Sequence, residues 1–235
     1  MAELTGTVFL VDDDGDSLRA GQNLVDSMRS PHQSFTSAET FLDSYNGDPG
    51  CLVTDYRMPG MNGLELVKEL QQRDRSLPFV LVTAYARTPL VVEAMRLGAL
   101  SVLEKPCNDD ELWQVIRQGL SVDAVQREAL QKTAHTREKL SSLTQKEQQV
   151  LDLVLAGEPN KTMAERLGVS LRTIENRRRN VFQKLEVGTV AELVTAVLST
   201  RQALEQRTTL ASVNSNGAAP AVAAATPQFA TPSQA

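Results

Sequence analysis

Short apolar runs and amphipathic stretches alternate along the first half of the chain. Five runs are predicted to be strands, and they cover residues 7–11, 33–36, 51–55, 79–83 and 101–104. Three of these five runs are almost continuously apolar. Continuous apolar runs are typical of parallel strands that are covered on both faces. Helical spacing follows each run, over residues 16–29, 38–44, 63–72, 89–97 and 109–120. The pattern predicts an α/β domain with a doubly wound, five-stranded parallel sheet, with the weak run 33–36 at an edge.

Only helical periodicity remains after residue 120. Residues 122–142 are charged, lack Gly and Pro, and carry a weak apolar seam, so they read either as a solvated helical linker or as a dimerising helix. Four further helices are expected at residues 144–155, 161–167, 171–185 and 189–199, which together form a small all-α domain. The end of the chain is a low-complexity mixture of Ala, Pro, Thr, Ser and Gln and is expected to be disordered. The expected regions are therefore 1–121, 122–142, 143–201 and a tail at 202–235.

Composition places the protein among ordinary globular proteins. Of 235 residues, 41% are apolar and 23% are charged. The two cysteines, Cys51 and Cys107, make no disulfide framework, which favours a reducing cytoplasm. The N-terminus has no basic region, and no apolar stretch reaches about 18 residues, so neither a secretory signal nor a membrane span is expected.

Charge is distributed unevenly along the chain. Residues 1–120 carry 10 basic and 18 acidic residues, whereas residues 141–200 carry 8 and 7. Within the second part, residues 172–184 hold five basic residues and one acidic residue. An acidic first domain and a basic stripe in the second indicate two domains with different partners.

Polar residues stand where four of the predicted strands end. Asp12 and Asp13 follow the first strand, Asp55 ends the third, Thr83 ends the fourth, and Lys105 follows the fifth. The carboxyl ends of neighbouring parallel strands meet at one edge of a sheet, where ligands bind in such folds. Residues almost a hundred positions apart are therefore expected to share one site.

Converging carboxylates need a counter-cation, since two like charges about 4 Å apart repel by about 4 kcal/mol at an effective dielectric near 20. All-oxygen ligands in an open site favour Mg²⁺ together with a phosphate. Lys105 supplies a second positive group, and Thr83 a hydroxyl for a phosphoryl oxygen. The set predicts phosphoryl transfer onto a carboxylate. In the same acidic run, Asp14 is better read as a helix cap, and Asp16 as a first-turn acid favoured by the helix dipole.

The motifs VFLVDDD, VTDYRMPGMNGLELV, LVTAYA and LEKP resemble those of a response-regulator receiver domain, over residues 5–120. The resemblance implies a flavodoxin-like receiver fold and a histidine kinase that phosphorylates Asp55. It also implies Mg²⁺ bound by Asp12, Asp13, Asp55 and the main-chain carbonyl of Arg57. By the same resemblance, Thr83 supplies the switch hydroxyl and Lys105 is the family's lysine. The resemblance also implies a cis peptide bond between Lys105 and Pro106, since only a bond to proline adopts the cis form at a small cost in free energy.

One position departs from the receiver pattern. Val102 stands where the family usually carries an aromatic switch residue. Tyr85, two residues after Thr83, is either a substitute signal carrier or simply loop surface. What the replacement does to signalling is not given by the sequence.

The helices of the second domain carry the start and stop signals of a helix-turn-helix. Thr144 and Glu147 form a capping box, Gly157 ends the first helix, Asn160 is expected to cap the second, and Ser170 caps the third. In the third helix, one face is apolar and the other is basic and polar. Two helices joined by a tight turn, the second positively charged, predict DNA binding in the major groove.

The polar face of the third helix, together with Lys161 in the second, supplies the candidate DNA contacts. Arginine and asparagine can read guanine and adenine, glutamate can accept from cytosine, and the flank suits phosphates. The candidates are Lys161, Arg172, Thr173, Glu175, Asn176, Arg177, Arg179, Asn180 and Lys184. The motifs LTQKEQQVL, NKTMAERLGVS and RTIENRRRNVFQKL resemble a LuxR/NarL-type DNA-binding domain, and with the receiver they resemble the FixJ branch. Arg177 replaces a histidine common in that family.

The sequence therefore predicts a phosphorylation-controlled transcription factor in the cytoplasm. Its expected partners are a histidine kinase, promoter DNA and a second copy, which pairs through residues 89–119 after phosphorylation. It is not expected to be an enzyme beyond promoting its own phosphorylation and dephosphorylation. Two alternatives remain: an aspartyl-phosphate phosphatase, because Asp12-x-Asp14 imitates its motif, and a nucleic-acid binder insensitive to phosphate. The kinase, the promoters and the sign of regulation are not given by the sequence.

Overall fold

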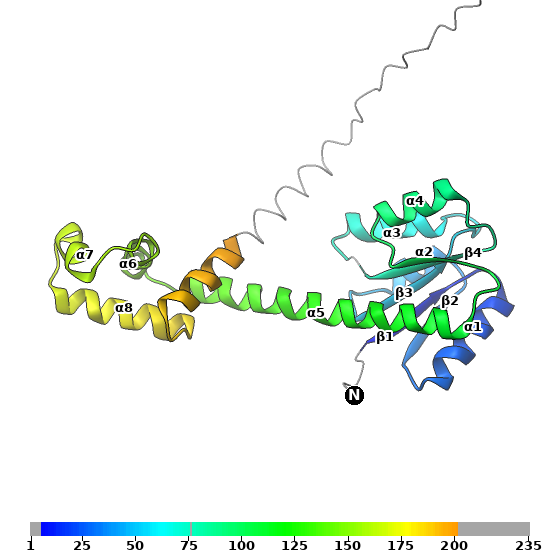
Figure 1. Ribbon diagram of the computed structural model, residues 1–235, viewed down its shortest axis with the longest axis horizontal. Coiled ribbons are helices and arrows are strands. Elements are labelled where there is room, and N and C mark those ends of the chain that lie inside the picture. The colour runs from blue at the N-terminus through cyan, green and yellow to red at the C-terminus, as the bar shows by residue number, and fades with distance from the viewer. Residues whose placement is uncertain (1–5, 76, 202–235) are drawn as a thin grey trace, which may run out of the picture.

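The computed structural model describes residues 6–75 and 77–201, so the predicted disordered tail at 202–235 lies outside the described residues. A five-stranded sheet forms the centre of the N-terminal domain (Figure 1). Its strands are β1 (Thr7–Val11), β2 (His32–Phe35), β3 (Gly50–Asp55), β4 (Phe79–Thr83) and β5 (Ser101–Glu104). All pairings are parallel and the order is β2-β1-β3-β4-β5. The predicted topology is confirmed, including β2 at an edge.

Five helices cover the two faces of this sheet. They are α1 (Gly15–Ser27), α2 (Ala38–Ser44), α3 (Gly63–Gln72), α4 (Thr88–Arg96) and α5 (Asp109–Ser141). Side chains alternate along each strand, so Phe9 and Leu52 pack with α2, α3 and α4, whereas Val8 and Val53 pack with α1 and α5. Full burial of such a side chain stabilises the fold by roughly 1.5–3 kcal/mol. The continuous apolar strands are thus explained by two cores, one on each face.

Capping side chains fix the helix starts beside the carboxyl ends of the strands. Asp14 accepts from the Ser17 N–H to start α1, and Asn62 forms a capping box with Glu65 at α3. Gly63 is required at this place, since a Cβ there would lie 2.2 Å from the main-chain oxygen of Asp55. The segment after β3 is therefore held tightly against the strand tip.

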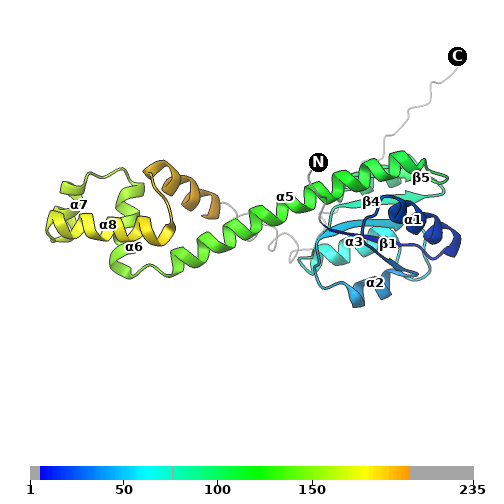
Figure 2. The same cartoon turned by 90° about the horizontal axis from the view of Figure 1, so that it is seen from below.

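Helix α5 is much longer than the helix predicted for residues 109–120. It spans 33 residues, about 50 Å at 1.5 Å per residue, and includes nearly all of the segment expected as a linker. Among the described residues it alone bridges the stretch between the two domains (Figures 1 and 2). The first part of α5 packs on the sheet, and Leu140 near its end packs into the core of the C-terminal domain.

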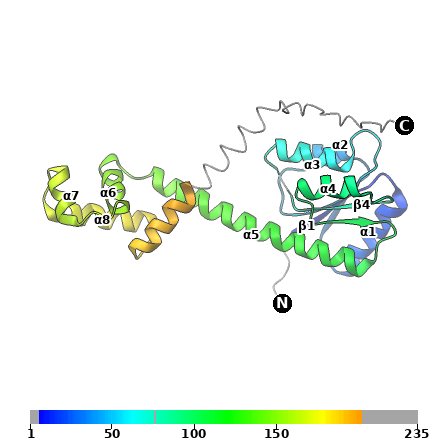
Figure 3. The ribbon, with the colours of Figure 1, turned by 45° about the horizontal axis from the view of Figure 1, so that its top comes forward.

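The C-terminal domain is all-helical. It contains α6 (Gln145–Leu155), α7 (Asn160–Leu167) and α8 (Leu171–Leu185), and residues 190–201 are also helical (Figure 3). Val150, Met163, Ile174 and Leu193 are fully buried in its core. The four predicted helices are present at nearly the predicted positions.

One predicted cap in this domain is wrong. Asn160 does not cap α7, because the helix begins at Asn160 and the preceding Pro159 occupies the cap position without a side-chain hydrogen bond. The side-chain oxygen of Asn160 accepts instead from Arg178 Nη1 at 2.8 Å. The Pro-Asn pair was ambiguous in sequence, since proline also fits the entrance of a helix.

Candidate phosphorylation site and DNA-binding helix

Four strand tips bring the predicted N-terminal site together. Lys105 Nζ lies 2.6 Å from Asp12 Oδ2 and 2.7 Å from Asp55 Oδ1, although the three residues are far apart in sequence. Asp12 and Asp55 are buried, with 8% and 7% of their surface exposed. The single positive charge of the ammonium group therefore reduces the repulsion between two carboxylates at the edge of the sheet.

Main-chain groups hold the remaining oxygens of these carboxylates. Asp12 Oδ1 accepts from the Asp14 N–H at 3.0 Å, and Asp55 Oδ2 accepts from the Arg57 N–H. Lys105 is fixed in turn by its own N–H, which donates to the Thr83 carbonyl at 2.8 Å, and its bond to Pro106 is cis. The two loops after β1 and β3 thus orient both carboxylates toward Lys105.

Burial and pairing shift the pKa values of this site. Burial dominates at Asp12 and raises the pKa of its carboxyl above the ordinary value, although Lys105 opposes the shift. Burial lowers the pKa of Lys105, but hydrogen bonds to Asp12 and Asp55 outweigh it and leave that pKa raised. The ammonium stays charged at neutral pH, as a group that stabilises negative charge must.

The other predicted residues lie around this centre. Asp13, next in the chain to Asp12, is exposed, and Thr83 is 1% exposed with its hydroxyl oxygen 3.3 Å from the Tyr85 nitrogen. Asp14 is committed to capping α1 and accepts from both the N–H and the hydroxyl of Ser17. This use of Asp14 removes the basis of the phosphatase motif Asp12-x-Asp14.

Sequence reasoning missed three contributions to this centre. Ser17 accepts from Lys105 Nζ at 3.3 Å, and the guanidinium of Arg57 lies 5.3 Å from the centroid of the Tyr85 ring. Glu104 Oε1 accepts from the Ala86 N–H at 3.4 Å. In the sequence, the only indication of these contributions was that Ser17, Arg57 and Glu104 lie near the ends of strands. Solvent-exposed loop residues lie in such positions too.

A cavity of about 490 Å³ opens beside the carboxylates, between α1 and α5. Its floor is apolar and includes Leu10 and Val82, while Asp12, Asp55 and Lys105 stand at one side. The three charged residues of the site therefore form part of the lining of this cavity.

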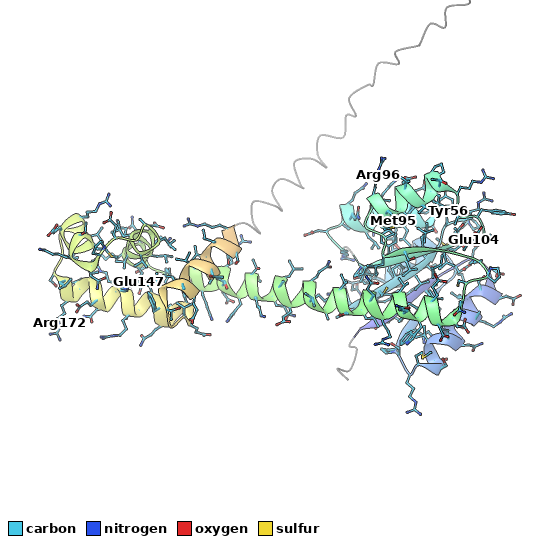
Figure 4. The ribbon with its side chains drawn as sticks, in the orientation of Figure 1. Tyr56, Met95, Arg96, Glu104, Glu147 and Arg172 are labelled. Carbon is cyan, nitrogen blue, oxygen red and sulfur yellow. The ribbon has the colours of Figure 1, made fainter. Side chains whose placement is uncertain are left out.

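The predicted DNA-binding side chains lie mostly on one exposed face of the C-terminal domain. Those exposed to solvent are Lys161, Arg172, Glu175, Asn176, Arg179, Asn180 and Lys184, while Thr173 and Arg177 are half-buried. Arg172 projects from the far end of the molecule (Figure 4). Helix α8 is therefore open over the stripe that was expected to read DNA.

Lys184 has an intramolecular partner at the opposite end of α8. Its ammonium lies 2.7 Å from Glu147 Oε2, and the same oxygen accepts from the Thr144 N–H at 2.8 Å. The hydrogen bond from Lys184, followed by that from Thr144, lowers the pKa of Glu147 to about 2. Contact between Lys184 and DNA stays a prediction, and within the chain this residue ties α8 to α6.

Arg178 was passed over in the sequence and has a structural role. It bonds Asn160 and lies 5.5 Å from the centroid of the Phe182 ring. The run Arg177–Arg179 therefore divides between half-buried side chains, of which Arg178 binds Asn160, and the exposed Arg179, which a charge count could not show.

Two family models match the chain, one over each domain. The response regulator receiver domain matches residues 8–117, and the bacterial regulatory proteins of the luxR family match residues 141–197. FixJ, a transcriptional regulatory protein of Azorhizobium caulinodans, is 38% identical over 192 residues, covering 81% of this chain and 91% of the relative. The chain is a response regulator of the FixJ type.

Further relatives match this response regulator over most of its length. The response regulator protein TodT of Pseudomonas putida is 32% identical over 206 residues, covering 87% of this chain and 91% of its own. The solved structure of the response regulator StyR is 40% identical, with a TM-score of 0.75, and covers 81% and 97% of the two chains. Full-length FixJ from B. japonicum, at 33% identity, covers 84% and 98% with a TM-score of 0.52.

Membership of this family establishes the general activity of the regulator. A receiver domain implies a histidine kinase as partner, and a LuxR-type domain implies DNA binding. The protein is a phosphorylation-dependent regulator of transcription. No helix within the described ranges is long and apolar enough to cross a membrane.

Proposed function

We propose that Asp55 is the residue that accepts the phosphoryl group. The observation that carries this proposal is the position of Asp55, buried at the tip of the central strand β3 with Lys105 Nζ 2.7 Å from one carboxylate oxygen. A carboxylate oxygen of Asp55 attacks the phosphorus of a phosphohistidine, the P–N bond breaks, and the imidazole departs. Lys105 offsets the charge that gathers on the phosphoryl oxygens.

The donor set fits a hard divalent cation such as Mg²⁺. Two buried carboxylates, one exposed carboxylate and a main-chain oxygen are the ligand types that Mg²⁺ prefers. Asp12, Asp13, Asp55 and the carbonyl of Arg57 would hold the ion, which when bound screens the phosphoryl charge. Among residues 6–75 and 77–201, no three acidic, His or Cys side chains are already gathered as a metal cage, and Lys105 provides the positive charge between Asp12 and Asp55.

The same residues account for a limited catalytic role. They act on a phosphoryl group that the chain itself carries, so the receiver promotes its own phosphorylation and dephosphorylation and turns over no separate substrate. Asp14, the residue that imitated a phosphatase motif, is engaged in capping α1.

Phosphorylation changes the surface next to the site. A phosphoryl group carries nearly two negative charges and attracts hydrogen-bond donors. The Thr83 hydroxyl, buried at the tip of β4, turns toward it, and the segment that leads into α4 moves. Val92 and Met95 on α4 are exposed, at 43% and 51%. We infer that two receivers pair through residues 89–119, which include this apolar patch.

Pairing brings two copies of α8 to neighbouring half-sites on promoter DNA. Arg172, Glu175, Asn176 and Arg179 face the base edges, while Lys161, Thr173, Arg177 and Asn180 lie on the flank that suits phosphates. Lys184 reaches a phosphate only if it leaves Glu147. We take the functional regions to be a receiver at 1–121, a helical linker at 122–142 and a DNA-binding domain at 143–201. The first residues of the linker stay bound to the receiver through Asp123 and Arg127.

The test compares the full chain with Asp55→Asn, using acetyl phosphate as phosphodonor. Asp43→Asn is the matched control, because Asp43 is an exposed acid on α2. A random DNA pool is first selected with treated wild-type protein. We expect the wild type and Asp43→Asn to gain one phosphoryl group by mass, to dimerise and to bind the selected duplex at least about tenfold more tightly. Asp55→Asn should do none of these, and a full response of Asp55→Asn would contradict the proposal.

A further inference from the structure

Residues 84–87 connect the phosphorylation site to α4. Tyr85 is 58% exposed, yet its ring lies 5.3 Å from the guanidinium carbon of Arg57. Arg57 follows Asp55 by two positions, and its N–H donates to the Asp55 carboxylate. The loops after β3 and β4 are therefore joined by one cation–π contact directly beside the phosphoacceptor.

A second contact ties the same loop to Thr83. The N–H of Tyr85 donates to Thr83 Oγ1 at 3.3 Å. The Ala86 N–H reaches Glu104 at the end of β5, which lies at the same end of the sheet as Tyr56, the residue after Asp55 (Figure 4). Helix α4 begins immediately afterwards, and its cap residue Arg87 makes no side-chain capping hydrogen bond. The position of the loop thus depends on contacts to the residues around the phosphorylation site.

We propose that Arg57 and Tyr85 form a latch that holds residues 84–87 in their unphosphorylated position. The proposal rests on the proposed phosphorylation of Asp55. A doubly negative group on Asp55 attracts the nearby guanidinium and recruits the Thr83 hydroxyl, so Tyr85 loses both contacts in one event. The released loop lets the start of α4 repack, and this change reaches the apolar patch of Val92 and Met95.

The position of Val102 explains why the latch lies in this loop. Val102 is half-buried on β5 and packs against the core on the α2, α3 and α4 face. It has no ring that can alternate between buried and exposed positions. Tyr85 is the aromatic residue whose backbone contacts Thr83 and whose ring contacts the loop of Asp55. Tyr85 and Arg57 therefore position the start of α4. Tyr85 is a positioning residue and does not itself contact the reacting phosphoryl group.

A weak latch suits a switch between two conformations. An exposed cation–π pair biases an equilibrium by a few-fold at most, so phosphorylation can overcome it. Removing the latch should favour the active conformation even without phosphate. Basal pairing and basal DNA binding should rise, while fully phosphorylated Tyr85→Ala, which keeps the Arg57 guanidinium, should change little.

The experiment uses the full chain as wild type, Arg57→Gln, Tyr85→Ala, the double variant, Tyr85→Phe and Arg87→Gln. Arg57→Gln keeps the main-chain carbonyl proposed for Mg²⁺, and Arg87→Gln removes a neighbouring exposed charge. Affinity for the selected duplex is measured without phosphodonor and with acetyl phosphate, and hydrogen exchange is followed over residues 84–96. We expect both single variants to bind about two- to fivefold more tightly without phosphodonor and to exchange faster in the loop.

Coupling separates the latch from a general loss of structure. The double variant should gain no more than either single variant, Tyr85→Phe should behave as the wild type, and Arg87→Gln should not raise basal affinity. Unchanged basal binding, additive gains or an equal gain in Arg87→Gln would overturn the latch. If wild-type protein itself fails to respond to acetyl phosphate while Asp55 is phosphorylated, the proposed function fails instead.

Discussion

Neighbouring carboxylates at the end of β1 stand in different surroundings. Asp12 is buried against Lys105, Asp13 is exposed, and Asp14 caps α1 through Ser17. Their chemistry is identical, so the difference arises from direction along the backbone and from contact with another strand. At this scale, each aspartate can be tested by replacement with asparagine, which keeps the shape and removes the charge.

Asp13→Asn should weaken Mg²⁺ binding by at least about tenfold, because a hard cation loses a charged oxygen ligand. Asp14→Asn is the matched control, since asparagine caps a helix as well as aspartate does. Isothermal titration calorimetry of the full chain with MgCl₂ measures both affinities. Equal affinities in the two variants would remove Asp13 from the proposed metal site.

Glu147 should make the C-terminal domain sensitive to acid. The pKa of Glu147 is lowered from 4.5 to about 2 by Lys184 and the Thr144 N–H. Since the folded-state pKa is depressed, the stabilisation is complete above about pH 4.5 and is lost as the pH falls toward 2. Hydrogen exchange of the buried Val150 and Leu151 amides should report this loss.

Glu147→Gln should lower the stability of the domain by about 2 kcal/mol at neutral pH and abolish most of its acid dependence. Glu165→Gln, at an exposed site on α7, is the control and should retain the wild-type profile. A wild-type pH profile in Glu147→Gln would show that the ion pair with Lys184 does not stabilise the fold.

At the scale of elements, α5 belongs partly to the receiver. Asp123 is 3% exposed and accepts from the Gly50 N–H at 2.9 Å and from Arg127 Nε at 2.7 Å. Arg127 also donates to the carbonyls of Gly47 and Asp48 at 2.8 and 2.9 Å. These bonds clamp α5 onto the start of β3 for two turns beyond the predicted end of the domain.

Arg127→Ala should destabilise the receiver by about 2 kcal/mol, because it leaves the buried Asp123 charge with less compensation. Lys132→Ala is the control on the same helix; it breaks an exposed pair with Glu128 and should cost under about 0.5 kcal/mol. Urea unfolding can be followed by the fluorescence of Trp113, the single tryptophan of the chain. Equal losses in both variants would argue against the clamp.

The elements also show what periodicity could and could not predict. Strand positions followed from continuous apolar runs, because each buried strand must be apolar on both faces. The continuity of α5 did not follow from the pattern, since the helical spacing over residues 109–120 and over 122–142 was interpreted as a receiver helix and a separate linker. The signal was the acid–base spacing of Asp123 and Arg127, but four-residue spacing also occurs in solvated pairs such as Glu128–Lys132.

At the scale of the whole molecule, α5 sets the relation between the two domains. Its receiver end is fixed by Arg127, and its other end by Lys139, whose ammonium lies 2.7 Å from Glu186 Oε2 after α8. Between these anchors the helix is the continuous spacer visible in Figures 1 to 3. Rotation about its axis therefore determines where α8 points relative to α4.

Inserting two alanines between residues 134 and 135 should turn the DNA-binding domain by about 200° and extend the spacer by about 3 Å. Acetyl phosphate should still phosphorylate the variant, but its affinity for a duplex with two half-sites should fall at least about tenfold. An insertion of seven helix-forming residues nearly restores the phase and should recover most of the affinity. If the two-residue insertion binds as the wild type does, α5 is no rigid spacer.

The sequence by itself determined the two domains, their elements and the set of residues at the strand tips. Apolar periodicity specifies local structure, and residues such as Asp12, Asp55, Thr83 and Lys105 can be named once a parallel sheet is predicted. The tertiary structure alone decided which carboxylate pairs with Lys105, that Arg57 covers Tyr85, that Lys184 binds Glu147, and that α5 is continuous. These contacts join side chains across the fold, and their distance and burial arise only when separate elements pack together.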